Sequence, residues 1–155
     1  TLGLSSAASD VYKRQIMGAR EVQAKNLADF LVENADGRPI VIHGKAYKPD
    51  VPYCIGSYST LIGYYIKAQG LEVQYIDPIA DDRTNCVDKI DDASIVLYAH
   101  NRYITYGYTG QSAVMNDFYC DIPKGSTIVD PWRSLPKKSN IYNVIHFGNT
   151  RNDKQ

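Results

Sequence analysis

The segment from Ile40 to Ser57 constrains the fold of this chain more than any other. It opens with three β-branched aliphatic residues followed by His43, which predicts a short buried strand that breaks at Gly44. A polar loop follows, and Ser57 stands where a serine caps a helix. A strand that feeds a helix through a glycine-marked loop puts that loop at the carboxyl edge of a sheet, where α/β proteins bind ligands. We therefore look for the function at this loop.

Other segments alternate between strand and helix patterns. Apolar runs of strand length occur at residues 72–76, 94–98, 126–130 and 143–147, and the run at 94–98 is almost continuous, as in a strand covered on both faces. Helical spacing occurs at residues 18–34, where Val22, Leu27, Phe30 and Leu31 are among the apolar positions, and at residues 57–68. Residues 87–93 and 111–119 are weaker helix candidates. The order predicts a Rossmann-like three-layer α/β/α fold with a mainly parallel sheet of about five strands, preceded by one linker helix.

The chain of 155 residues is long enough for one domain with a substantial core. Residues 1–15 resemble a translated sequencing-adaptor tail, which we expect to be disordered or helical only by accident. A cleaved signal peptide is the rival interpretation, but it would need an apolar core that this segment lacks. We assign residues 16–36 to the linker helix and residues 37–150 to the Rossmann-like domain.

Charge and cysteine usage exclude several classes of function. Lysine and arginine total 17, and aspartate and glutamate also total 17, so no net field draws the chain to nucleic acid or an anionic membrane. No apolar run approaches the ~20 residues of a membrane span. Cys54, Cys86 and Cys120 lack a C-x-x-C spacing, and the three histidines lack a metal-ligand spacing. We expect no metal and a reducing, cytoplasmic location.

Polar residues follow the carboxyl ends of four predicted strands. They are Lys45 and Lys48, Asp77, the group from His100 to Arg102, and Asp130 with Arg133. In a parallel sheet these ends share one rim, where two or three cations can meet a phosphorylated ligand. Polar residues also fill such loops for solubility, so each residue alone has a plain surface interpretation.

Two residues of these loops have competing interpretations. Asp77 can take a ribose hydroxyl or cap a loop amide before Pro78. Cys54 suggests a nucleophile near Lys48, but the sequence places no base beside it. The glycines do not form G-x-G-x-x-G, so this domain is not expected to hold a dinucleotide in that way.

The segment Gly44-Lys45-Ala46-Tyr47-Lys48-Pro49-Asp50, the later Tyr75-Ile76-Asp77-Pro78 and the pair of Asp130 and Arg133 resemble motifs of one family. They are similar, in order and spacing over roughly residues 18–147, to the carboxyl-terminal domain of UDP-glucose/GDP-mannose dehydrogenases. The resemblance implies a Rossmann-like domain that closes over a nucleotide sugar. It also implies an amino-terminal domain that binds most of the NAD, a helical linker that forms a homodimer, and two-step oxidation of the sugar alcohol to a carboxylate, as in polysaccharide biosynthesis.

The resemblance assigns substrate binding to Tyr47, Lys48 and Arg133, with Lys48 as the counter-charge to the diphosphate. Arg133 stands one place later than the family's arginine, and Ile55 and Gly56 occupy the loop where the family has an arginine and a glutamate. The family's catalytic cysteine segment has no counterpart here, so the chain is expected to be a fragment that is not catalytically competent alone. A non-catalytic Rossmann-like nucleotide-binding or oligomerisation module is the alternative.

Overall fold

The computed structural model describes residues 2–49, 51–100, 122–133, 135 and 143–148. At its centre lies a five-stranded sheet in which every strand pair is parallel, with the order β2-β1-β3-β4-β5. The strands are β1 (Ile40–His43), β2 (Val73–Ile76), β3 (Ile95–Tyr98), β4 (Thr127–Val129) and β5 (Asn143–Ile145). All five lie within the predicted runs, which confirms the Rossmann-like α/β fold.

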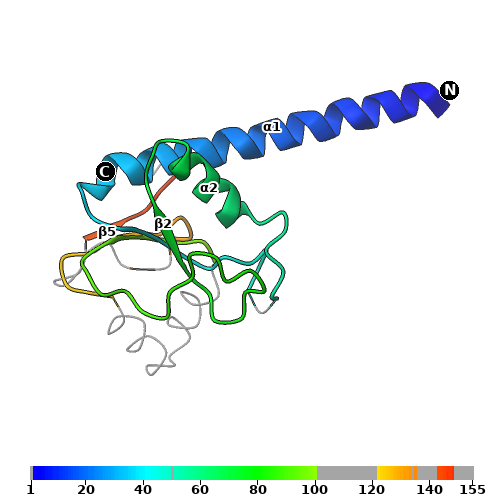
Figure 1. The fold of residues 1–155 in the computed structure, drawn as a ribbon. Coiled ribbons are helices and arrows are strands. Elements are labelled where there is room, and N and C mark those ends of the chain that lie inside the picture. The colour runs from blue at the N-terminus through cyan, green and yellow to red at the C-terminus, as the bar shows by residue number, and fades with distance from the viewer. Residues whose placement is uncertain (1, 50, 101–121, 134, 136–142, 149–155) are drawn as a thin grey trace.

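Both described helices cover the same face of the sheet. Helix α1 spans Leu2–Ala35 and helix α2 spans Tyr58–Lys67. Buried side chains of the two helices form one core cluster with alternate residues of β1, β2 and β3, such as Ile42, Tyr75 and Leu97. The carboxyl half of α1 lies along the sheet beside α2, while its amino half projects beyond the domain (Figure 1). The apolar side chains of its inner face therefore hold α1 against the sheet.

The side chains of α1 are buried or exposed according to which face of the helix they lie on. Ala24, Leu27, Ala28 and Leu31 are buried, whereas Val22 is 59% exposed, so the prediction that Val22 faces the core is wrong. Ala24 and Ala28 occupy the inner face of α1, and their small side chains let the helix lie close to the sheet. Val22 lies on the outer face of the helix. The helix continues through residues 2–15, and its residues 7–15 are exposed. The assignment of residues 1–15 to an adaptor tail stays a prediction.

The opposite face of the sheet is covered differently in the described residues. Val41, Val96, Tyr98 and Ile128 project there and pack against apolar side chains from connecting segments, namely Ile90, Ile122 and Leu135. The helix predicted over residues 87–93 is wrong, because this segment has no helical structure. Backbone hydrogen bonds of Tyr75 with residues 85 and 87 instead hold the start of this segment beside β2. The candidate helix at 111–119 lies outside the described residues.

A glycine sets the distance between α2 and β2. A Cβ placed on Gly63 would clash with the Tyr75 hydroxyl oxygen, which lies directly over the helix at this point. We expect Gly63→Ala to destabilise the fold by about 1–3 kcal/mol, the usual cost of overpacking. Chemical denaturation measures this loss, and Gly18→Ala, on an open part of α1, is the control that should not lose stability.

The same clash predicts a rescue. Tyr75→Phe removes the hydroxyl oxygen, so the double variant Gly63→Ala/Tyr75→Phe should recover part of the lost stability. If the two substitutions simply add, the close approach of Gly63 to Tyr75 is not the reason for glycine at this position.

Candidate functional site

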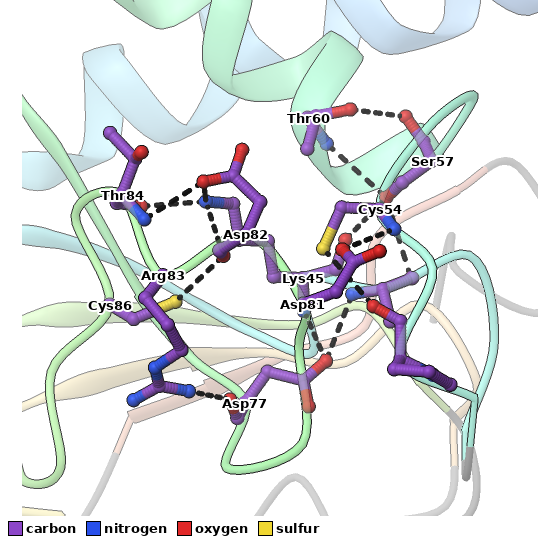
Figure 2. Close-up of polar contacts among 12 residues, drawn as sticks. Lys45, Cys54, Ser57, Thr60, Asp77, Asp81, Asp82, Arg83, Thr84 and Cys86 are labelled. Atoms are coloured by element: carbon purple, nitrogen blue, oxygen red, sulfur yellow. Dashed lines mark hydrogen bonds and ion pairs between the residues drawn. The ribbon is translucent and has the colours of Figure 1, made fainter.

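Asp77 fixes the start of the loop that follows β1. Its side chain is buried, and one carboxylate oxygen accepts hydrogen bonds from the backbone amides of Lys45 and Ala46, each at 2.9 Å. The other oxygen accepts from the Ile79 amide at 3.3 Å. These bonds join the loops after β1 and β2, as Figure 2 shows for the contacts of Asp77. The interpretation of Asp77 as a residue that caps loop amides is therefore confirmed.

Lys45 is buried between the same two loops. Its ammonium group donates to the carbonyl oxygens of Asp82 at 2.9 Å and Thr84 at 2.6 Å, and it lies 3.4 Å from the Asp82 carboxylate (Figure 2). It also lies 4.9 Å from the centroid of the Tyr75 ring. The Thr84 amide and hydroxyl, and then the Lys45 charge, lower the pKa of the Asp82 carboxyl to about 2. Lys45 is thus a structural cation with its donors directed at protein atoms.

Ser57 closes the loop and begins α2. Its hydroxyl accepts from the amides of Ser59 and Thr60 and donates to the carbonyl oxygen of Lys45 at 2.6 Å. The helix start is therefore capped by the chain itself, as the sequence predicts. At the other end of the loop, a Cβ on Gly44 would lie 2.6 Å from the His100 ring, so this turn is filled by an imidazole. These residues do not fit a dinucleotide pyrophosphate at the first strand-to-helix turn.

Tyr47 and Lys48 stand on the outside of this fixed loop. Tyr47 is 60% exposed, Lys48 is also exposed, and the Tyr47 amide donates to the Tyr53 carbonyl oxygen at 2.7 Å. The loop therefore presents one lysine outward while the other is buried. Sequence reasoning placed both lysines on the rim, and for Lys45 the structure corrects that placement, because its side chain is only 3% exposed.

Asp130 organises the turn after β4 in the same manner. Its fully buried carboxylate accepts from the amides of Trp132 at 3.0 Å and Leu135 at 2.8 Å, and it lies 3.8 Å from His146. Arg133 has a φ of 56°, a left-handed conformation in this turn. Its guanidinium donates to the carbonyl oxygens of Phe147 and Gly148. The predicted arginine therefore links the β4 turn to the end of β5.

The loops that bear Lys48 and Arg133 leave the same edge of the sheet. Both follow the carboxyl ends of parallel strands, and β3 alone separates β1 from β4. Two strand spacings amount to about 10 Å, a span comparable to a nucleoside diphosphate. His100 follows β3 between them and is buried, and its ring contacts the Ala46 carbonyl oxygen at 2.9 Å. Asn101 and Arg102 lie outside the described residues.

His43 gives the fold a specific dependence on pH. Burial, and then the neighbouring His100, lower the pKa of His43 to about 4, while its ring stacks on Tyr98 at 4.8 Å. An unfolded histidine has a pKa near 6.5. Between this pH and about pH 4, His43 is therefore protonated in the unfolded chain and neutral in the folded one. The His43 contribution is present above pH 6.5 and is lost as pH falls toward 4.

We therefore expect the stability of the protein to fall by about 2 kcal/mol between pH 7 and pH 5 through His43 alone. Denaturant unfolding at both pH values measures it. His43→Phe keeps a stacked ring without a titrating group, so its loss over this range should be smaller by that amount. Equal losses in the two proteins would show that the buried imidazole is not the cause.

Cys54 does not have the properties of a nucleophile. Its side chain is buried, and burial raises the pKa of its thiol above the ordinary value. Burial raises the pKa of Cys86 as well. A reactive cysteine needs a lowered pKa, so the suggestion of an activated thiolate at Cys54 is corrected. In the described ranges there is no group of three His, Cys, Asp or Glu placed to hold a metal ion.

Comparison with known proteins supports the fold. No protein-family model and no curated protein matches this sequence. Among solved structures, the chain is similar to a derivative structure of the UDP-N-acetyl-mannosamine dehydrogenase Cap5O from S. aureus, with 16% sequence identity and a TM-score of 0.55. The match covers 84% of this chain and 32% of that protein. The likeness establishes a shared Rossmann-like fold over about a third of the larger protein.

Within the described part of the chain, neither helix is both long and apolar enough to cross a membrane.

Proposed function

We propose that this chain is the nucleotide-sugar-binding domain of an NAD-dependent nucleotide-sugar 6-dehydrogenase. The observation that supports it most is the arrangement of one sheet edge, where an exposed Lys48 and the Arg133 turn follow strands separated only by β3. The fold shared with a UDP-N-acetyl-mannosamine dehydrogenase supports the same proposal.

The chemistry of this edge suits an anionic ligand. Lys48 offers an exposed ammonium on a loop that Asp77, Lys45 and Ser57 hold in place, so little ordering is needed when a diphosphate binds. Tyr47 adds an exposed ring beside it. Arg133 contributes a second cation from the β4 turn.

The proposal divides the reaction between two parts of a larger protein. NAD would be held mainly by an amino-terminal domain, and it would accept hydride from the sugar alcohol there. This chain would bind and orient the nucleotide sugar, and α1 would link the two domains and form a homodimer. On its own the chain would bind the ligand weakly, because the complete site lies between domains.

Lys48→Ala should weaken binding of UDP and of UDP-glucose by about 10- to 150-fold, because a charge-assisted hydrogen bond contributes about 1.5–3 kcal/mol. Calorimetric titration at millimolar ligand, with ligand-observed NMR where the heat is small, measures the affinities of both proteins. The control is Lys67→Ala, which removes an exposed lysine at the far end of α2. Unchanged affinity in Lys48→Ala would remove this lysine from the site.

A binding module without catalysis is the second candidate, and the raised pKa values of Cys54 and Cys86 are compatible with both candidates. The coding sequence upstream of residue 16 distinguishes the two. A glycine-rich dinucleotide-binding unit and a catalytic cysteine there would support the dehydrogenase, and their absence would support the module. Titration with UDP, UDP-glucose and GDP-mannose identifies the base and the sugar in either case.

A further inference from the structure

Trp132 is the large aromatic residue of the β4 turn, and it is held at two points. Its backbone amide donates to the Asp130 carboxylate at 3.0 Å, and its indole Nε1–H donates to the Tyr98 carbonyl oxygen at 2.9 Å. Even so, the residue is 45% exposed. A tryptophan anchored in this way keeps part of its apolar ring in solvent rather than in the core.

The second anchor gives the position of the ring. Tyr98 is the last residue of β3, and β3 lies between β4 and β1. The indole therefore lies at the carboxyl ends of β3 and β4, and β1 with its Lys48 loop follows on the other side of β3. Its position lies within the interval that a ligand spanning Lys48 and Arg133 would occupy.

The chemistry of the exposed surface restricts what it can bind. The only polar group of the indole is the Nε1–H, and that group is already bonded to Tyr98. What remains is an uncharged aromatic face, which cannot donate a hydrogen bond to a phosphate but can stack on a flat ring. Because both anchors fix the ring beforehand, stacking would require little loss of side-chain freedom.

From this geometry we propose that the Trp132 indole is the stacking surface for the nucleobase of the ligand. The assignment rests on the proposed function and extends it, because it places the base near β3 and β4 and the diphosphate toward Lys48. Nucleobases stack well on aromatic side chains because every base has a π-face, and one such contact changes affinity by about 5- to 150-fold.

The chain contains one tryptophan, so its intrinsic fluorescence reports on this residue alone. Titration with UDP should change the emission as the base stacks, whereas inorganic pyrophosphate should bind without that change, and glucose should have no effect. A change with glucose alone would assign the surface to the sugar and overturn the proposal. Binding of UDP, seen by calorimetry, with unchanged emission would overturn it as well.

Two variants separate the ring from its hydrogen bond. Trp132→Phe and Trp132→Leu both lose the bond to Tyr98, but only Trp132→Phe keeps an aromatic face. UDP affinity should fall about 5- to 150-fold in Trp132→Leu and much less in Trp132→Phe, with pyrophosphate affinity unchanged in both. Equal UDP affinity in Trp132→Leu and Trp132→Phe would contradict the stacking assignment and would leave the proposed function untouched. If the wild-type protein binds neither UDP nor pyrophosphate, the proposed function fails, and the nucleobase assignment fails with it.

Discussion

Asp77→Ala should destabilise the protein by about 3–5 kcal/mol, the largest loss we expect from a single substitution outside the apolar core. The Asp77 carboxylate accepts three backbone amides, and the two at Lys45 and Ala46 belong to buried residues. Alanine removes every acceptor at once, and each buried amide left without a partner costs about 1–3 kcal/mol. Equilibrium unfolding in urea measures the loss.

Two further variants make this result specific. Asp88→Ala removes a fully exposed carboxylate from the following loop and should leave stability within about 0.5 kcal/mol of the wild type. Asp77→Asn keeps one carbonyl oxygen, so it should lose less than Asp77→Ala. A loss below about 1 kcal/mol in Asp77→Ala would mean that the β1 loop does not depend on this carboxylate.

Lys45→Met should destabilise the protein by about 2–4 kcal/mol, while Lys48→Met should leave its stability unchanged. Methionine keeps most of the lysine stem, so the substitution removes chiefly the ammonium that bonds to the carbonyl oxygens of Asp82 and Thr84. Lys48 is exposed, so its loss has no such cost. Thermal or urea unfolding of the two variants compares the structural lysine with the one that we propose binds the ligand.

The ligand affinities of these variants should show the reverse pattern. Lys48→Met should bind UDP more weakly at full stability, whereas folded Lys45→Met should retain most of its affinity under conditions that keep it native. If Lys48→Met unfolds as readily as Lys45→Met, the two lysines do not have the separate roles that their burial indicates.

The strands of this protein could be predicted from the sequence because burial on both faces leaves an apolar run that few other structures produce. The run at 94–98 became β3, which is buried at all four residues. The helix prediction for residues 87–93 was wrong because Ile90 is the single buried residue of this segment, and one apolar residue cannot define a helical period. The prediction for Val22 failed for another reason, because the small residues Ala24 and Ala28 occupy the inner face of α1.

The loops at the carboxyl edge of the sheet could be predicted from the sequence, but the burial of their individual side chains could not. Lys45 and Lys48 stand in the same polar loop, and the sequence pattern does not show that contacts with the β2 loop bury Lys45. A signal that was available is the repeated Asp-Pro pair after a strand. Asp77 precedes Pro78 and Asp130 precedes Pro131, and both aspartates are buried acceptors of backbone amides. Trp132, for which we propose stacking, has no sequence signal beyond its place between Asp130 and Arg133.

The central claim is that the carboxyl edge of this sheet binds a nucleoside diphosphate, and backbone amide NMR with added UDP tests it most directly. We predict that the amide shifts cluster in residues 45–48 and 131–133, which lie on loops that leave that edge. Shifts that cluster instead at Gly37 and Glu72, beside the amino ends of β1 and β2, or no shifts at millimolar UDP, would contradict the account.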